Sequence, residues 1–583
     1  METENKSEIN EEQNEEEVLF SDVSPESLHL QDRVLSVLVH KMNITKLTQI
    51  QADSFSPIVN GKDVLIRADT GSGKTLSYLI PIMQKLVLDF PKDTNPINRS
   101  MGPLVVIVCP TRELCLQTAT VVDKFKSQMP YITPGTLLGG EKVGSEKKRI
   151  RKGINILITT PGRIIYHVKN SQNLQFPNLK FLVLDEADRL LDMGFLKPIT
   201  ELIHTLPERQ TILLSATLPP QLKELTELSL KNPVNIGTMK SEDFSIPPTL
   251  CQRFVVVRPK WRLTALAALL RRCVNDIPDM KAIVFINNCL SVDFHYTFFN
   301  YFKYMTPAER RERKSKPRNL NQENKRDEES KGNATIKDIH ASTDNDEIGG
   351  YSPYLKCPIF RIHGNVDQID RAKTISKYTT EKTAVLFCTD VAARGLDIPG
   401  ITTIIQYDPP IDTEDYVHRV GRTARIGNDG IAYLFLQDFE LGFINLLENK
   451  KVNIKEYGFQ RLVKRAVAAM KGDDDDLCFA AMKKETVSTV EDNDLENLAA
   501  RAWASSIKAY TSHKKETRLI FDKTKLHLGH MAAAFGLEKT PQDIKEMLSE
   551  ERELISKSKR PDEPGANDQQ FLPAFEERTS EFL

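Results

Sequence analysis

Four short segments of this 583-residue chain hold side chains that could bind a nucleotide and its metal ion. In chain order they are residues 68–75, 185–188, 215–217 and 418–425. The first two could build a site that binds and hydrolyses ATP. The last supplies arginines from a distant part of the chain. A site assembled from two such halves would couple hydrolysis to the closure of two domains.

The first segment has the composition of a loop that binds phosphate groups. It consists of Ala68, Asp69, Thr70, Gly71, Ser72, Gly73, Lys74 and Thr75, after an apolar run and before an apolar helix. Glycines let backbone N–H groups approach phosphate oxygens, and the start of a helix adds a positive dipole end. We expect Lys74 to reach the β- and γ-phosphates of ATP and the Thr75 hydroxyl to bind Mg²⁺. A glycine-rich turn without a ligand is the alternative, but the agreement of strand, loop and helix favours the phosphate site.

Asp185 and Glu186 follow the apolar run 181–184, which has the pattern of a buried strand. Ligands of open α/β sheets bind at the carboxyl ends of the strands, so both carboxylates are well placed for ATP. Asp185 should hold Mg²⁺, partly through water, because this ion keeps much of its hydration shell. Glu186 is the candidate base for the attacking water. Carboxylates at a strand end are a weak signal alone, and the upstream phosphate loop makes them a strong one.

The overall composition is that of an ordinary globular protein. Hydrophobic residues make up 40% of the chain and charged residues 27%, and the formal net charge of −1 gives no overall basic excess. The eight cysteines include no C-x-x-C pair, which argues against zinc and disulfide frameworks. The amino terminus is rich in Glu, unlike a signal peptide, and the sequence has no apolar run of membrane-spanning length. We therefore expect a monomer that makes no contact with membranes.

Apolar runs alternate with helical patterns, which predicts an α/β protein with two tandem doubly wound parallel sheets. The expected strands are 64–66, 104–108, 154–158, 181–184, 211–214, 282–286, 384–388, 403–406 and 431–436. The expected divisions are an acidic disordered tail (1–17), a first domain (18–240), a linker (241–250), a second domain (251–450) with a disordered insert (306–350), a helical C-terminal extension (451–540) with a flexible acidic linker (472–497), and a flexible tail (541–583). The disordered parts are assigned from their charged, polar composition.

The motifs in this order resemble those of the DEAD-box RNA helicases. The matching residues are the phosphate loop, then Asp185, Glu186, Ala187 and Asp188, then Ser215, Ala216 and Thr217, and last His418, Arg419, Gly421, Arg422 and Arg425. The resemblance covers roughly residues 20–445. It implies two RecA-like domains, RNA-dependent ATP hydrolysis, and ATP with Mg²⁺ as cofactors.

The resemblance assigns further residues to ATP. Gln51 resembles the glutamine that reads adenine, since its amide offers a donor and an acceptor. Phe20 resembles the aromatic residue that stacks on the base, with simple packing as the alternative. The remaining assignments are Gly395 and Asp397 at the ribose, and Arg422 and Arg425 as arginine fingers. The chain departs from the family at Met42, Asn43 and Leu47, where relatives often have Gly-aromatic and Pro.

Two more groups of residues are assigned by the same resemblance. Asp188, Ser215, Thr217 and His418 resemble the network that couples ATP to RNA. The candidates for RNA contact are Pro110, Thr111, Arg112, Gly139, Gly140, Thr160, Pro161, Gly162, Arg163, Gln368, Arg371, Thr389 and Asp390. Backbone donors, hydroxyls and arginines suit phosphate and 2′-OH groups, so we expect single-stranded RNA to bind without sequence preference.

The C-terminal part narrows the expected role. Residues 503–510, 520–522 and 525–537 resemble an extension of nucleolar DEAD-box helicases of large-subunit ribosome assembly. With Ala424 before Arg425 and the charged insert, they indicate the subfamily that resembles yeast ATP-dependent RNA helicase seven and its metazoan relatives. The implied partners are pre-ribosomal RNA, pre-ribosomal particles and protein activators, and the implied location is the nucleolus within the nucleus.

Some features keep two readings. The basic run 310–318 is a nuclear import signal or RNA-contacting arm, or else a solvated charge run. His527 and His530 could suggest a metal, but helix packing or RNA contact fits them better. A non-catalytic RNA-binding scaffold is the alternative function, and intact Lys74 and Glu186 argue against it. A DNA helicase is the third reading, and the DEAD-box pattern disfavours it.

Overall fold

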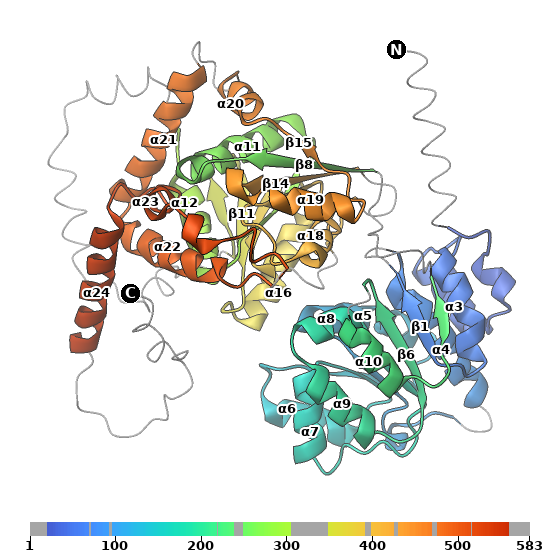
Figure 1. Cartoon of the computed structure of the whole chain (residues 1–583). Helices are drawn as coiled ribbons and strands as arrows, with labels where there is room; N and C mark the ends of the chain where they lie inside the picture. The colour runs from blue at the N-terminus through green and yellow to red at the C-terminus, as the bar shows by residue number, and fades with distance from the viewer. Residues whose placement is uncertain are drawn as a thin grey trace, which may run out of the picture.

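The computed structural model describes residues 20–68, 72–91, 96–217, 220–237, 249–304, 348–390, 398–424, 429–468, 475–514 and 516–558. Each of two domains is built around one largely parallel sheet, and the C-terminal helices lie on the second domain (Figure 1). The expected disordered tail over 1–17 and residues 306–347 of the expected insert lie outside the described residues. Among the described helices, none has both the length and the apolar character that crossing a membrane requires.

The first domain contains a seven-stranded sheet in the order β3-β4-β2-β5-β6-β1-β7, and every pair is parallel. Its strands are β1 (Val64–Arg67), β2 (Val105–Val108), β3 (Pro134–Leu137), β4 (Ile156–Thr159), β5 (Phe181–Leu184), β6 (Gln210–Ser215) and β7 (Val234–Ile236). Along β2, Val105 and Ile107 join one buried cluster while Val106 and Val108 join another. Both faces of the sheet are therefore covered, as a doubly wound fold requires.

Helices on the two faces complete this domain. They are α2 (Asp32–Ser36), α3 (Gln49–Val59), α4 (Lys74–Asp89), α5 (Arg112–Lys126), α6 (Val143–Lys152), α7 (Pro161–Asn170), α8 (Ala187–Asp192), α9 (Leu196–Thr205) and α10 (Pro220–Ser229), with short turns η1 (Pro25–Leu28), η2 (Val37–Lys41) and η3 (Arg99–Met101). The five predicted strands are confirmed. Strands β3 and β7 were not predicted, because β3 contains Pro134 and Gly135 and β7 has only three residues.

The second sheet has eight strands in the order β10-β11-β12-β9-β13-β14-β8-β15, and only β10 runs antiparallel to its neighbour among the described strands. The strands are β8 (Leu250–Val256), β9 (Lys281–Phe285), β10 (Gly350–Ser352), β11 (Cys357–Ile362), β12 (Ala384–Cys388), β13 (Thr403–Gln406), β14 (Gly430–Leu436) and β15 (Lys455–Glu456). The four strands predicted here are confirmed. The sheet extends past residue 450 through β15, so the expected boundary cuts through it.

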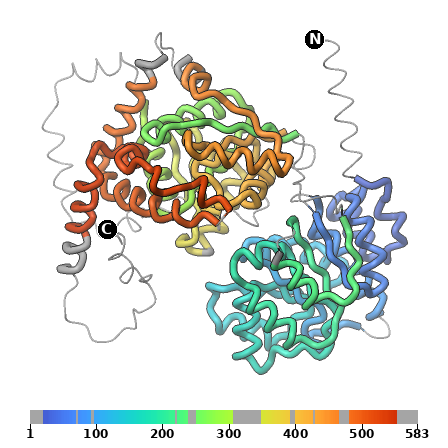
Figure 2. The backbone as a smooth tube through the Cα atoms, viewed as in Figure 1, coloured from blue at the N-terminus to red at the C-terminus, as the bar shows by residue number. Residues whose placement is uncertain are grey.

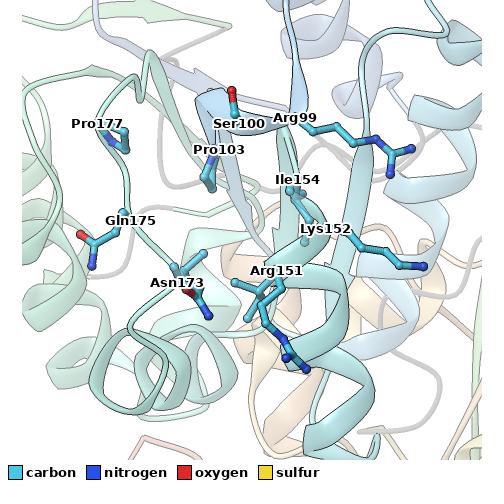
Figure 3. A pocket seen from close by; sticks show the side chains of 13 residues that line it. Arg99, Ser100, Pro103, Arg151, Lys152, Ile154, Asn173, Gln175 and Pro177 are labelled. Carbon is cyan, nitrogen blue, oxygen red and sulfur yellow. The ribbon is translucent and has the colours of Figure 1, made fainter.

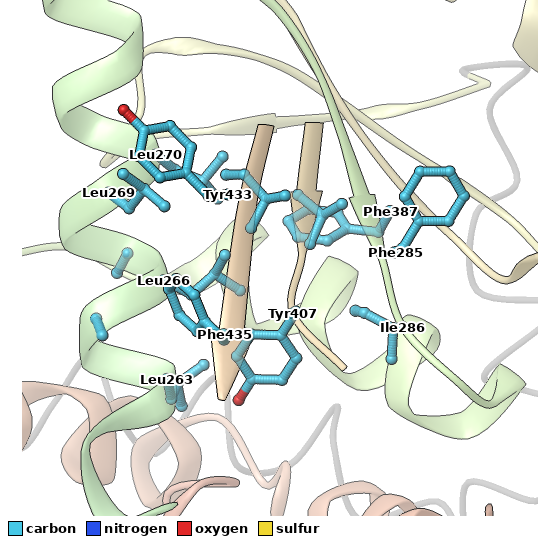
Figure 4. Close-up of a cluster of buried hydrophobic side chains, with 14 of the residues drawn as sticks. Leu263, Leu266, Leu269, Leu270, Phe285, Ile286, Phe387, Tyr407, Tyr433 and Phe435 are labelled. Carbon is cyan, nitrogen blue, oxygen red and sulfur yellow. The ribbon is translucent and has the colours of Figure 1, made fainter. Parts of the chain in front are cut away.

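Helices and short helical turns after the first domain surround the second sheet and form the C-terminal region. They are η4 (Pro259–Trp261), α11 (Arg262–Asp276), α12 (Cys289–Tyr301), α16 (Gln368–Thr380), α18 (Thr413–Val420), η5 (Asp438–Glu440), α19 (Gly442–Asn449), α20 (Phe459–Ala468), α21 (Asp475–Asp492), α22 (Glu496–Tyr510), η6 (Lys523–Lys525), α23 (Leu528–Ala533) and α24 (Pro541–Ser558). At the centre of the domain, Leu266 of α11 and Phe435 of β14 belong to the buried cluster of Figure 4.

The C-terminal extension shares one hydrophobic core with the second domain. Helix α22 packs on α12, and the rings of Phe535 and Phe294 meet edge to face at 5.3 Å. The Trp503 Nε1–H donates to the Leu528 carbonyl at 3.2 Å, which satisfies its polar group inside the packed region. The continuous tube in Figure 2 shows the C-terminal helices lying against the second domain. The extension is therefore part of that domain's fold.

Two expectations for this region are wrong. The flexible acidic linker over 472–497 contains the 18-residue helix α21, in which Phe479, Met482 and Val490 are buried. Their spacing of three and then eight residues places them on one helical face, and the acidic residues gather near the helix ends. The flexible tail over 541–583 begins with α24, in which Ile544 is fully buried. Composition suggested disorder because charge hid these apolar faces.

Replacing Ile544 with Ala is expected to lower the free energy of unfolding of the second domain by about 2–4 kcal/mol. The reason is that the side chain is fully buried and its removal leaves a cavity. Urea unfolding followed by circular dichroism measures the change. The neighbouring exposed Lys545 provides the control, and Lys545→Ala should shift stability by less than about 0.5 kcal/mol. Equal stabilities of the two variants would mean that α24 does not pack on this domain.

Candidate functional site

The predicted nucleotide residues converge on one edge of the first sheet. Strands β1, β2, β5 and β6 are parallel, so their carboxyl ends lie at the same edge. The phosphate loop follows β1, Asp185 follows β5, and Thr217 follows β6. The Ala68 N–H donates to the Ser215 carbonyl at 3.1 Å, which joins the start of the loop to the end of β6. The fold thus brings together segments that are far apart in the sequence.

Lys74 and Thr75 are the first residues of α4, where backbone N–H groups have no partner within the helix. Gly73 has φ +84°, in the left-handed region that favours glycine. A Cβ atom on Gly73 would lie 2.3 Å from Gln51 Nε2, so a larger residue would displace the Gln51 amide. Ser72 and Ala68 are described, while the predicted Asp69, Thr70 and Gly71 lie outside the described residues.

The predicted adenine glutamine is joined to the phosphate loop. The Gln51 Nε2 group donates to the Gly73 carbonyl at 3.1 Å, and its Oε1 accepts from the Thr48 N–H at 3.1 Å. Phe20 pairs with Thr48 in an isolated antiparallel bridge, and its side chain is half-buried. One amide N–H of Gln51 remains for a ligand. These contacts place Phe20 and Gln51 beside one short segment.

Two of the positions that depart from the family pattern, Asn43 and Leu47, make local contacts or adopt backbone conformations that suit the residues present. Asn43 adopts φ +54°, a left-handed conformation that asparagine tolerates better than most residues. Leu47 is fully buried, and its N–H donates to the Val23 carbonyl at 3.0 Å. A proline at position 47 has no N–H and could not make this bond. The loop is therefore held by different contacts from those that proline would permit.

Asp185 is buried and poised for a cation. Its Oδ2 accepts a hydrogen bond from the Tyr78 hydroxyl at 3.1 Å. Burial, with the nearby charge of Glu186, raises the pKa of Asp185 to about 6, while Lys74 acts in the opposite direction. A carboxylate that lacks hydration is stabilised by a divalent cation, so the residues present fit Mg²⁺. Asp185 and Thr75 would hold the ion, and no group of three or more His, Cys, Asp or Glu side chains in the described ranges offers a complete metal cage.

Glu186 has strained backbone geometry. Its φ of 48° and ψ of 56° are left-handed, and it immediately precedes α8. A non-glycine residue in this region costs of order 1–3 kcal/mol and is common at functional sites. The strain is offset by the buried strand before it and the buried first turn of α8 after it. The left-handed backbone places the Glu186 Cα at the turn between β5 and α8, next to Asp185.

Asp188 links the DEAD segment to β6. Its Oδ2 accepts from the Thr217 N–H at 2.9 Å, the Thr217 hydroxyl at 3.0 Å and the Ala216 N–H at 3.1 Å. The Ser215 hydroxyl donates to the Thr217 carbonyl at 2.5 Å. Three of the four predicted coupling residues therefore form one network within the first domain.

The fourth predicted coupling residue, His418, lies in the second domain. It is part of α18, and burial together with the charge of Arg189 lowers its pKa, so the ring is neutral. Its Nδ1 is buried without a hydrogen-bond partner in the described part of the chain. The same helix leads to Arg422, which is 7% exposed and donates through Nε to the His418 carbonyl at 3.1 Å. Arg425, Gly395 and Asp397 lie outside the described residues.

A buried ion pair joins the two domains directly beside these residues. The Arg189 Nη1 of α8 lies 2.6 Å from the Asp415 Oδ1 of α18, and the two side chains are 3% and 6% exposed. Burial alone would lower the pKa of Arg189, but Asp415 reverses that and raises it. The pair connects α8, the helix that follows Glu186, to α18, the helix that ends two residues before Arg422. It was not predicted, because no local pattern relates two residues this far apart in sequence.

The RNA candidates of the first domain lie at loop-to-helix junctions. Thr111 caps α5 by accepting from the Leu114 N–H at 3.3 Å, and Arg112 is the next residue. Gly140 has φ +86°, and a Cβ there would lie 2.4 Å from Arg112 Nη1. The glycines therefore make room for the Arg112 guanidinium. Pro110 is buried beside Thr111, and Thr160, Pro161 and Gly162 begin α7.

Three charged RNA candidates have protein partners instead. Arg163 Nε donates to Glu146 Oε2 at 2.6 Å. Arg371 of the second domain pairs with Glu113 of the first domain at 2.8 Å. Asp390 accepts two hydrogen bonds of 2.6 Å from Arg419. Thr389 is buried, and Gln368 begins α16.

His527 and His530 lie at the start of α23. His527 Nδ1 accepts from the His530 N–H at 3.1 Å, which caps α23, and the two rings stack with centroids 3.8 Å apart. Both histidines are exposed, so the pair caps the helix at the surface, and the choice between helix packing and RNA contact stays a prediction. The structure gives the histidines a role that needs no metal ligand.

A separate hollow of about 440 Å³ lies at the opposite edge of the first sheet (Figure 3). Pro103 before β2, Ile154 before β4 and Gln175 before β5 line it, and Arg151 stands at its side. These residues precede the strands, whereas the nucleotide residues follow them. The hollow is therefore distinct from the candidate site.

Comparison with known families supports this geometry. The sequence model of the DEAD/DEAH box helicase family matches residues 48–225, and that of the helicase conserved C-terminal domain matches residues 336–427. The chain is 34% identical, over 90% of its length and 92% of the relative's, to the DEAD-box ATP-dependent RNA helicase 17 of Oryza sativa. The chain belongs to the DEAD-box helicase family. The RecA-like nature of both domains follows from this membership.

Other relatives of this DEAD-box protein extend the comparison. The chain is 36% identical to the ATP-dependent RNA helicase dbp7 of Schizosaccharomyces pombe, with 89% of this chain and 74% of the relative covered. It is 33% identical to the ATP-dependent DNA helicase DDX31 of Homo sapiens over 94% of this chain, but spans only 65% of that protein. The model for the C-terminal extension of ATP-dependent rRNA helicase SPB4-like proteins matches residues 492–543.

Solved structures agree with the DEAD-box fold. The DEAD-box helicase Mss116, bound to single-stranded RNA and UDP-BeF, superposes with a TM-score of 0.69 at 24% identity. The alignment covers 93% of this chain and 98% of that one. At this identity the similarity supports the fold, including the helical region after the second sheet.

Proposed function

We propose that this DEAD-box protein is an RNA-dependent ATPase that remodels RNA by closing its two domains around ATP and a single strand. The observation that carries the proposal is the buried Arg189–Asp415 pair, which joins the helix after Glu186 to the helix that leads to Arg422. ATP bound between these helices would favour the closed state, and hydrolysis would release it.

The residues of this chain have distinct roles in the proposed reaction. Lys74 and the start of α4 bind the β- and γ-phosphates, and Asp185 with Thr75 holds Mg²⁺, which neutralises phosphate charge when bound. Glu186 accepts the proton of the attacking water. Arg422 stabilises the charge of the transferred phosphoryl group. Because Arg422 belongs to the second domain, turnover depends on closure.

Single-stranded RNA is the proposed polymer, bound by residues on both sides of the cleft. Arg112 beside Gly139 and Gly140 and the helix start at Thr160 offer a guanidinium and backbone N–H groups, which suit phosphates. We further propose that the substrate is precursor RNA of the large ribosomal subunit, in the nucleolus. The match of residues 492–543 to the extension of SPB4-like rRNA helicases supports this assignment.

DNA remodelling is a second candidate, because relatives from Homo sapiens and Dictyostelium discoideum are named ATP-dependent DNA helicases. The chain spans 65% and 66% of their lengths. The non-catalytic scaffold remains the third reading. The RNA-dependent ATPase, the DNA helicase and the scaffold each predict a different response of ATP turnover to added RNA or DNA.

Stimulation of ATP turnover by RNA and DNA strands of the same sequence distinguishes these functions. We expect the RNA strand to raise turnover at least about tenfold more than the DNA strand, because the 2′-OH is the group that differs. A strand with 2′-O-methyl riboses is the control, since it keeps the sugar geometry but removes the donor. Equal stimulation by DNA would support the DNA helicase, and no stimulation by any strand would support the scaffold.

The assignment to ribosome assembly has its own test. Crosslinking of the Glu186→Gln protein in cells should capture the closed state on its substrate. We expect the bound reads to concentrate on the precursor of the large ribosomal RNA. Reads spread over messenger RNA would leave the RNA-dependent ATPase intact and contradict the assembly role.

A further inference from the structure

The segment between α22 and α23 crosses the loop that precedes α18. We call its described residues, 511–514 and 516–522, the crossing segment. The Thr517 hydroxyl donates to the Ile411 carbonyl at 2.7 Å. His513 stacks on Phe521 with ring centroids 4.0 Å apart. Just before this segment, Tyr510 donates its hydroxyl proton to Glu440 at 2.5 Å. The crossing segment is therefore held firmly against the second domain.

Lys514 extends from the crossing segment into the space between the domains. Its Nζ lies 2.6 Å from Asp412 Oδ2 and 3.1 Å from Asp192 Oδ1. Asp192 is the last residue of α8 in the first domain. Asp412 caps α18 in the second domain by accepting from the Asp415 N–H at 2.7 Å. The Lys514 amine thus contacts α8 of the first domain and the start of α18, the helix that leads to Arg422, in the second domain.

The charges around Lys514 explain why it matters for closure. Among the described residues, this cluster contains three carboxylates and two cations. The carboxylates are those of Asp192, Asp412 and Asp415, and the cations are Arg189 and Lys514. Partial burial disfavours a charged amine, but the hydrogen bond and charge of Asp412 raise the pKa of Lys514, so it stays protonated. Without Lys514, closure would bring three carboxylates together with a single cation. Like charges brought close destabilise the arrangement that contains them.

We propose that Lys514 makes the C-terminal extension part of the machinery of domain closure, by bridging α8 and α18 only when the two domains meet. Lys514 is a positioning residue, because it acts through the two helices and not on ATP. The inference rests on the proposed function, in which closure precedes hydrolysis. By reciprocity, any ligand that moves the crossing segment away would open the protein, and closure would hold that segment in place.

The experiment measures closure directly and turnover in parallel. Dyes attached through unnatural amino acids, one on each domain, report closure by energy transfer in the presence of single-stranded RNA and a non-hydrolysable ATP analogue. We expect Lys514→Ala to require about three- to tenfold more RNA for half-maximal closure, as for the loss of a partly exposed ion pair. The difference in closure between Lys514→Ala and the wild type should shrink as salt is added. The reason is that Lys514 and Asp192 are both partly exposed, so salt screens their attraction.

Three further variants make the result specific. Lys545→Ala removes an exposed lysine from the same extension and should close like the wild type. Lys514→Arg keeps the charge and should recover most of the closure. Asp192→Asn removes the first-domain carboxylate that faces Lys514, together with its 3.8 Å contact with Arg189. If Lys514 acts through Asp192, the two substitutions together should cost less than the sum of the two single effects. Melting temperatures without ligand should be equal, since Lys514 is half exposed.

The outcomes separate the inference from the proposed function. Closure of Lys514→Ala at the same RNA concentration as Lys545→Ala would overturn the inference, and so would additive effects of the changes at 192 and 514. In either case RNA-stimulated turnover of the wild type would still support the ATPase. A wild-type protein that closes but shows no RNA-stimulated turnover would overturn the proposed function. The energy-transfer measurement would still test the role of Lys514 in closure.

Discussion

RNA-stimulated ATP turnover of the Glu186→Gln protein is expected to be about 10²- to 10⁴-fold below that of the wild type. Glutamine has the same shape as glutamate but cannot accept a proton from the attacking water. The substitution also keeps the left-handed backbone at this position, with φ 48°, since both side chains strain it equally. ATP affinity should change by less than about threefold, because Glu186 acts on the water and not on the phosphates. Single-turnover hydrolysis and nucleotide titration measure the two quantities separately.

The control for this substitution is Glu208→Gln, which removes an exposed carboxylate of the same domain. Glu208 is 85% exposed and contacts Lys231. It precedes β6, whereas the candidate site lies where the strands end. Turnover of this variant should match the wild type. If Glu186→Gln also kept full turnover, another group would have to activate the water, and the assignment of the base would be incorrect.

Loss of the Arg189–Asp415 pair should have the second largest effect. Removing one partner of a buried ion pair leaves an uncompensated charge and costs about 3–5 kcal/mol. The cost falls on the closed state, because the two side chains meet only across the cleft. The Arg189→Ala protein should therefore lose about two to four orders of magnitude in its closing equilibrium. Energy transfer between the domains, with RNA and a non-hydrolysable ATP analogue, measures it.

A double substitution tests the cause. Changing Arg189 to Met and Asp415 to Leu together replaces both charges with apolar groups, which should recover part of the closure. Arg151→Ala removes an exposed arginine of the same domain and is the control. Normal closure of Arg189→Ala would mean that the pair does not hold the two domains together. A lower melting temperature of that variant without ligand would point to a role inside the first domain.

The strands that carry the site could be predicted from the sequence because they are buried on both faces. In β2 and β5 every residue is apolar and buried, so a short run of Val, Ile, Leu and Phe is sufficient to identify them. Strand β3 contains proline and glycine and escapes this rule. Helix α21 was missed because acidic composition predicts disorder, whereas its buried face consists of a few apolar residues within an acidic segment. Tertiary packing decides both cases.

The candidate site was predictable where its chemistry is local. The phosphate loop is one contiguous segment and Asp185-Glu186 is another, and the parallel pairing of their strands brings both to one edge. The partners of charged side chains were not predictable. Arg371 pairs with Glu113, and Arg163 with Glu146, and a sequence does not reveal which carboxylate will lie within reach. The same limit concealed Lys514, whose two partners belong to different domains.

The shared core of the second domain has a consequence for synthesis on the ribosome. The first domain uses residues up to β7, so its sheet is complete early and can fold while the rest of the chain is still being made. The second domain cannot complete its core until Ile544 has left the ribosome tunnel. During that interval α12 would expose Phe294 and the apolar surface that α22 later covers. Nascent chains should therefore need protection by chaperones late in translation, after the nucleotide-binding half is already formed.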